Sequence, residues 1–329
     1  MIGFLLCLLI ACLYKTTFIK GKDCFFEEPL KLANIIPLRG ILAVEIVLGH
    51  TYGHLENNSL LYFNNRIGVW VVGIFFFLSG YGLNYSFHRK KDYLEGFLVK
   101  RVGRILFPFV IVCIVNYFLG LCGSLLDCMF QDWFVVEMTL IYCIWYFVYR
   151  YLPEKYAVPV FAFLVLALNV LGTYYGTGSR WYGSTACFLL GISFEKNEKT
   201  IFSYCRAGYG KKVGICVAFF VLGGISFVLS ENNLFANTLT INVTCILLCI
   251  IVYLFMMKIK TGNALTHFLG CISWQIYVSH RTFLKVYDQL EVANDFMYMF
   301  LLFGSVIAVS YGLWFCEKEI CVMKNQTYR

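Results

Sequence analysis

Three titratable side chains lie within one apolar stretch, LRGILAVEIVLGH, at residues 38–50. They are Arg39, Glu45 and His50. A charged side chain near the centre of a bilayer helix costs about 2.5–3.5 kcal/mol on insertion scales, so a helix that keeps such groups is a candidate for function. Among these groups, a histidine imidazole titrates near neutral pH and can serve as a general base.

Helical spacing relates Arg39 to His50. Their separation of eleven residues corresponds to three turns plus about 20°, which puts both on one face, about 16 Å apart along the axis. By the same geometry, Glu45 lies about 140° away from His50. We therefore expect Glu45 to contact another helix or to stay protonated.

Two more titratable residues lie well inside apolar segments, Glu137 and His280. Intramembrane ionisable groups are functional candidates by default. A structural role stays open for both: Glu137 as a partner of a neighbouring helix, and His280 as an anchor of the outer interface beside Arg281.

The composition points to a membrane environment. The chain is 60% hydrophobic and 14% charged, whereas soluble domains carry about 25% charged residues. Apolar runs of about 20 residues recur, and the alternating pattern of outer-membrane barrels is absent. We predict an all-α, multi-pass protein of the cell membrane, surrounded by lipid bilayer. About eleven candidate helices lie near residues 1–19, 36–55, 67–87, 105–125, 133–150, 156–174, 181–195, 213–230, 239–257, 264–283 and 296–315.

Basic residues are distributed unevenly between the gaps that alternate along these helices. Of 27 lysines and arginines, all but Arg66, Arg180, Arg281 and Lys285 lie in or beside one set of gaps. Because cytoplasmic loops carry the excess of Lys and Arg, the N-terminus is predicted outside and the C-terminus in the cytoplasm. The same bias accounts for the net charge of +8, so we expect no nucleic-acid partner.

In this orientation the charged residues are arranged by depth. Arg39, Arg101 and Arg104 mark the cytoplasmic mouth, and His50 and His280 reach a similar height in the outer half. Glu137 lies near them, one turn below the outer end of its helix. This polarity suggests an anionic ligand that enters from the cytosol, with chemistry deeper in the membrane.

The cysteines and the N-terminus carry weaker signals. Fifteen cysteines include no C-x-x-C pair and no Cys/His set with zinc spacing, so we expect small buried hydrophobes and no metal site. The apolar start at residues 1–14 resembles a signal-peptide core. However, basic residues follow it and none precedes it, which favours a retained helix.

Five motifs in sequence order resemble those of the acyltransferase-3 family of integral-membrane acyltransferases. The first is an arginine followed by ten residues and a histidine, Arg39 to His50. The others are IFFFLSGYGL (74–83), LVKRVGRILFPF (98–109), DWFVVEMTLIY (132–142) and ISWQIYVSH (272–280). The resemblance divides the chain into an additional N-terminal helix with a basic loop (1–34), a ten-helix acyltransferase domain (35–315) and a cytoplasmic tail (316–329).

The resemblance implies transfer of an acyl group, commonly acetyl, from cytosolic acyl-CoA to a carbohydrate or glycan acceptor, often at the outer face. It implies that Arg39 and His50 are the central pair. We expect neutral His50 to act as the base, because burial disfavours its charged form. Glu137 or His280 would orient His50 or hold the acceptor. A covalent acyl-histidine is an open variant.

Acyl-CoA would be a co-substrate, with no bound cofactor. Guanidinium groups suit phosphate, so Arg39, Arg101 and Arg104 are expected to bind the CoA phosphates. A further set, assigned to substrate contact or helix packing, comprises Ser79, Tyr81 and Trp133. Close packing is the favoured role of Ser79 and its neighbour Gly80.

A membrane transporter or translocase is the rival interpretation, since proton-coupled carriers also use intramembrane Arg, Glu and His. Carriers usually show two related halves, and the sequence contains no such repeat. A non-catalytic scaffold would leave the Arg39–His50 stripe unexplained.

Overall fold

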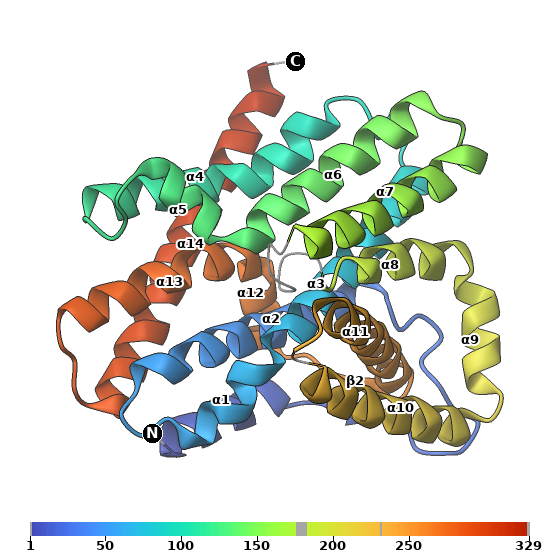
Figure 1. The fold of residues 1–329 in the computed structure, drawn as a ribbon, viewed down its shortest axis with the longest axis horizontal. Helices are drawn as coiled ribbons and strands as arrows, with labels where there is room; N and C mark the ends of the chain where they lie inside the picture. The colour runs from blue at the N-terminus through green and yellow to red at the C-terminus, as the bar shows by residue number, and fades with distance from the viewer. Residues whose placement is uncertain (1, 176–182, 231, 328–329) are drawn as a thin grey trace.

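The computed structural model describes residues 2–175, 183–230 and 232–327, with side chains up to Ile320. Arg180 and the first two residues of the predicted helix at 181–195 lie outside these ranges. The predicted all-α class is confirmed: α-helices dominate the described residues, joined by turns, loops and one two-stranded ribbon (Figure 1).

The helices follow the predicted apolar runs. In the first half they are α1 (Ile2–Leu13), α2 (Leu32–Thr51), α3 (Tyr62–Arg89), α4 (Gly103–Phe118), α5 (Leu125–Gln131), α6 (Trp133–Tyr151) and α7 (Glu154–Tyr174). In the second half they are α8 (Ala186–Lys196), α9 (Glu198–Arg206), α10 (Tyr209–Leu229), α11 (Leu234–Met256), α12 (Ala264–Cys271), α13 (Ser273–Gln289) and α14 (Asp295–Thr327). The predicted helix at 264–283 is divided between α12 and α13. A π-helical turn, Leu98–Val102, leads into α4.

The strands β1 (Thr17–Phe18) and β2 (Ile259–Lys260) pair in antiparallel fashion. They join the segment after α1 to the connection between α11 and α12. Nζ of Lys258 reinforces this junction by donating to the carbonyl oxygen of Gly21 at 2.7 Å. The N-terminal segment is therefore fastened to the rest of the protein.

Six helical segments of the described residues are long and apolar enough to cross a membrane. They contain α2, α3, α7, α10, α11 and α14. A seventh span results if α5 and α6, which are bent by 79° at their junction, count as one. The other apolar runs form short helices, such as α1 with 12 residues, whereas a bilayer core takes about 20. The fold is that of a polytopic membrane protein.

Helix α2 packs against α12 through two glycines, one on each helix, and each glycine lies against the backbone of the other helix. A Cβ atom on Gly40 would overlap the carbonyl oxygen of Thr266, and one on Gly270 would overlap that of Ile36. Without a hydrophobic force between helices in lipid, such small residues allow the close van der Waals contact that holds helices together.

Helices α3 and α8 repeat this arrangement. A Cβ atom on Gly80 would overlap the carbonyl oxygen of Phe188, and one on Gly191 that of Phe77. The close contact expected around Ser79 and Gly80 is therefore made at Gly80. Ser79 itself is half-buried.

The buried side chains form two clusters, and α2 contributes to both. The larger cluster includes Leu42 and Ile46 of α2, and it extends to the fully buried Trp145 of α6. The smaller cluster includes Val44 and Val47, packed with residues of α12, α13 and α14. Because it lies between the clusters, α2 has its position fixed from two sides.

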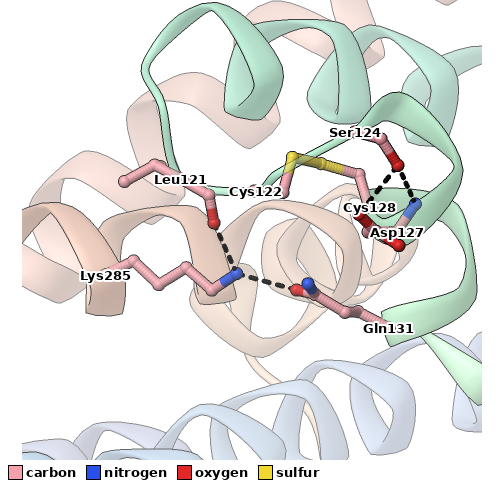
Figure 2. Close-up of a disulfide and its surroundings, with 7 residues drawn as sticks. All are labelled: Leu121, Cys122, Ser124, Asp127, Cys128, Gln131 and Lys285. Carbon is pink, nitrogen blue, oxygen red and sulfur yellow. Dashed lines mark hydrogen bonds between the residues drawn. A yellow bond between two sulfur atoms is a disulfide. The ribbon is translucent and has the colours of Figure 1, made fainter.

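A disulfide joins Cys122 to Cys128 in the connection between α4 and α5 (Figure 2). The expectation that the cysteines are buried hydrophobes is therefore wrong for this pair, and Cys7, Cys24 and Cys316 are exposed. The free cysteines that are buried, as expected, are Cys12, Cys113, Cys187, Cys205, Cys245 and Cys249. The bonded cysteines are six positions apart in the sequence, so no short cysteine motif predicted the bond.

The Gly191→Ala variant is expected to be less stable. The new methyl group would meet backbone atoms of Phe77 and Tyr81 and push α8 away from α3. Overpacking of this kind costs about 1–3 kcal/mol, which should appear as a lower thermal unfolding midpoint in detergent. Gly214→Ala in α10 is the matched control. Among the described residues, no heavy atom outside its own stretch of helix lies within 4 Å of the Cβ atom that this substitution adds. Equal losses in both variants would contradict this explanation.

Candidate functional site

Two histidine rings meet at the C-terminal end of α2. Nε2 of His280 lies 3.1 Å from Nδ1 of His50, and the ring centroids are 4.8 Å apart. This contact agrees with the similar height predicted for the two residues. His280 is fully buried and His50 is half-buried, so the pair has one partly accessible member.

The hydrogen-bond partners of the two rings fit one arrangement of protons. Nδ1 of His280 lies 2.6 Å from the carbonyl oxygen of Tyr277, which can only accept, so in a neutral ring this nitrogen carries the proton. Nε2 of His280 then accepts from Nδ1 of His50, which also lies 2.9 Å from the carbonyl oxygen of Ile46. This assignment from the network makes Nε2 the basic nitrogen of neutral His50.

Arg281 completes the cluster. Its Nη2 lies 3.3 Å from Nε2 of His50, and its Nη1 donates to the carbonyl oxygen of Gln131 at 3.2 Å. Its Nε lies 3.4 Å from Oδ1 of Asp132, the residue between α5 and α6. Sequence reasoning gave Arg281 no role beyond flanking His280. The available signal was its rarity, as one of four basic residues on the sparsely charged side.

Arg39 lies near the other end of α2 and is half-buried. Its guanidinium is close enough to the Tyr142 hydroxyl and to the Arg101 guanidinium for both to act on its charge. Among the residues that the structure describes, no carboxylate lies within ion-pair distance of Arg39. This end of α2 thus has two neighbouring cations, and Arg39 has no acidic partner within that range.

The two predicted partners of Arg39 differ in their surroundings. Arg101 lies in the π-helical turn, a rare geometry that often marks functional positions, and its guanidinium is 5.5 Å from the Tyr93 ring centroid. Arg104 is more exposed, and its Nε lies 3.8 Å from a carboxylate oxygen of Glu317 in α14. The structure therefore brings Arg101 near Arg39, whereas Arg104 has an acidic neighbour.

Glu137 is 6% exposed, and its Oε2 has no hydrogen-bond partner in the described part of the chain. It lies one turn after Phe134, whose ring packs 4.9 Å from that of Tyr277 in α13. Glu137 is therefore on the side of α6 that faces α13. Within the described ranges, no hydrogen bond or ion pair connects its carboxyl group to His50 or His280.

Glu45 has the contact to another helix that its angle predicted. Its Oε1 accepts a 2.7 Å hydrogen bond from Nδ2 of Asn64 in α3. The bond lies where Gly49 brings the two helices together, because a Cβ atom there would be 2.8 Å from the carbonyl oxygen of Asn64. Glu45 thus ties α2 to α3.

The described contacts of Tyr81 and Trp133 do not include either histidine of the pair. The Tyr81 hydroxyl donates to Oε1 of Glu198 in α9 at 3.0 Å. The Trp133 ring meets that of Phe134 at 6.0 Å. Neither residue, nor Ser79, is hydrogen-bonded to His50 among the described contacts. The described residues also contain no group of three or more His, Cys, Asp or Glu side chains that could hold a metal ion.

Comparison with known proteins adds a family-level finding. A family model described as an acyltransferase domain matches residues 32–315. The match begins at the first residue of α2, and it includes the histidine pair, Arg281 and the cations around Arg39. No curated protein and no solved structure matches the chain.

Replacing Asn64 by alanine should destabilise the protein, because Glu45 would lose its donor in a partly buried position. Leaving a buried polar group without its partner costs about 1–3 kcal/mol, which should lower the thermal unfolding midpoint. Glu45→Gln should keep the wild-type midpoint, since its amide oxygen can accept the same bond. The neighbouring exposed Asn65→Ala serves as the control, and the tie is disproved if it is as damaging as Asn64→Ala.

Proposed function

Because the chain belongs to the acyltransferase-3 family of membrane acyltransferases, we propose that it transfers an acyl group, in the simplest case acetyl, from cytosolic acyl-CoA to a hydroxyl group. The proposed acceptor is a cell-surface carbohydrate or related glycan. The observation that carries this proposal is the arrangement of α2: toward one end is Arg39, which has no acidic partner among the described residues, and at the other end is a hydrogen-bonded histidine pair.

The donor's phosphates are assigned to the end of α2 that carries Arg39. Guanidinium groups bind phosphate through paired, charge-assisted hydrogen bonds, and Arg39 has no carboxylate to compete for it among the described residues. Arg101 supplies a second positive charge nearby, and Arg104 contributes from a more exposed position. An extended thioester arm would cover the rise of about 16 Å from Arg39 to His50.

The acyl-transfer step is assigned to His50. Nε2 takes the proton of the acceptor hydroxyl while its oxygen attacks the thioester carbonyl carbon, forming a tetrahedral intermediate. Collapse of this intermediate breaks the carbon–sulfur bond, and the imidazolium returns the proton to the departing thiolate. General base catalysis of this kind contributes about 10²–10⁴-fold to rate.

His280 and Glu137 have supporting roles in this proposal. The bond from His280 Nδ1 to the Tyr277 carbonyl oxygen fixes its ring, so Nε2 is directed at His50 as an acceptor. Glu137 offers a buried carboxyl oxygen without a hydrogen-bond partner in the described chain. A hydroxyl group of the acceptor would satisfy it, because burying a polar atom without a partner is costly.

The His50→Ala variant should lower kcat by about 10²–10⁴-fold. The measurement is release of free CoA from acetyl-CoA by purified protein in detergent, with a mixture of oligosaccharides as acceptor. His267→Ala is the control, since His267 is exposed on α12 and should keep normal turnover. Near-normal turnover by His50→Ala refutes the base assignment. If the wild-type protein shows no thioester turnover, the transporter interpretation gains, because transport has no meaning in detergent.

The Arg39→Gln variant should raise the KM for acetyl-CoA by about 10–100-fold, the equivalent of a lost charge-assisted contact of about 1.5–3 kcal/mol. The fold should persist, because no ion-pair partner among the described residues is left behind. Arg66→Gln is the matched control, as this exposed arginine of α3 stacks on Tyr62. Equal changes in KM for both variants would speak against a donor site at Arg39.

A further inference from the structure

The Arg281 side chain is held in place from one side and directed at His50 on the other. Gln131 accepts a hydrogen bond from Nη1, and Asp132 lies beside Nε. These contacts leave Nη2, which lies 3.3 Å from Nε2 of His50. The guanidinium thus connects the junction of α5 and α6 to the histidine pair.

The junction that holds Arg281 is itself braced (Figure 2). The Cys122–Cys128 disulfide closes the connection into α5, and the Ser124 side chain caps this helix by accepting from the backbone N–H of Asp127. Lys285, one turn after Arg281 on α13, donates to the carbonyl oxygen of Leu121 and to Oε1 of Gln131. Two cations of α13 therefore bind the same segment, but among the described contacts only that of Arg281 reaches His50.

The position of Arg281 selects one form of His50. A guanidinium has no acceptor, so a ring nitrogen that faces it must be unprotonated. His280 imposes the same form from the other side, because its Nε2 requires a proton on Nδ1 of His50. Both neighbours thus favour the neutral ring with Nε2 as the base.

We propose that Arg281 is a positioning residue, which holds His50 in the neutral, Nδ1-protonated form through a guanidinium anchored at the α5–α6 junction. This inference rests on the proposed function, in which His50 is the base. A distance of 3.3 Å is long for a nitrogen–nitrogen hydrogen bond, so an acceptor hydroxyl can replace the Nη2 contact. The contacts to Gln131 and Asp132 keep the guanidinium beside the site when that happens.

The tautomer of His50 is directly measurable. The chain has five histidines, so protein labelled with ¹⁵N-histidine gives few ring signals, and His50→Gln identifies those of His50. The wild-type spectrum should show a protonated Nδ1 and an unprotonated Nε2. In Arg281→Met, His50 should exchange between tautomers, and turnover of acetyl-CoA should fall about 10²-fold, toward the loss of general base catalysis. Arg281→Lys keeps the charge and should partly restore both the wild-type tautomer of His50 and the turnover of acetyl-CoA.

Lys285→Met is the matched control, because it removes the bonds to the Gln131 side chain and to the Leu121 carbonyl oxygen and leaves the Arg281 contacts in place. It should keep the wild-type tautomer and lose less than about threefold in turnover, since a lost exposed bond costs little. A loss as large as that of Arg281→Met would show a bracing role only and overturn the proposal. A wild-type tautomer in Arg281→Met would overturn it as well.

Two further variants separate this test from folding and from the proposed function. If Arg281→Met fails to fold because Asp132 is left buried without its cation, the double variant Arg281→Met with Asp132→Asn removes that charge, and the same spectrum decides. Turnover by His50→Ala refutes the base assignment itself, whatever the spectra show. An inactive His50→Ala together with an unaffected Arg281 variant refutes the role of Arg281 alone.

Discussion

Direct contact between the backbones of α2 and α12 sets the geometry on which the site depends. Gly40 and Gly270 allow each helix to touch a carbonyl oxygen of the other, and lipid offers no hydrophobic force that could replace this contact. Since α13 begins two residues after α12 ends, the same contact fixes where α13 starts. His280 then meets His50 at 3.1 Å. The packing of two glycines is thus a condition for the pairing of two histidines.

Arg39 differs from the charged residues around Glu195 in whether it has a partner of opposite charge. Glu195, on the side of α8, holds Arg89 at 3.0 Å and also accepts from Asn84 and His88, which ties α3 to α8 as a closed network. Arg39 has no such acidic partner among the described residues, although it is half-buried. Burying a charge without a partner costs free energy, so a half-buried cation of this kind would normally lower the stability of the protein. A ligand phosphate offers the compensation that the closed network finds internally.

The sequence was sufficient to predict the all-α class, from the recurring apolar runs, and the similar height of His50 and His280, from the rise of a helix. The same helical geometry correctly predicted that Glu45 contacts another helix, away from the face that carries His50. The role of Arg281 depends on Gln131 and Asp132, which reach it only because α5 and α6 bend by 79°. That bend, the Cys122–Cys128 bond and the short lengths of several helices arise from tertiary packing, which no periodicity records.

The disulfide has a consequence for the chemical environment of the two ends of the protein. Disulfides persist in oxidising compartments, and this one is linked through Gln131 and Arg281 to the end of α2 that carries His50. In the predicted orientation, Arg39 faces the reducing cytosol, where a free thiol such as that of CoA is stable. In that orientation, a single helix would lie between two redox environments, with the proposed thiol donor at one end and the disulfide at the other.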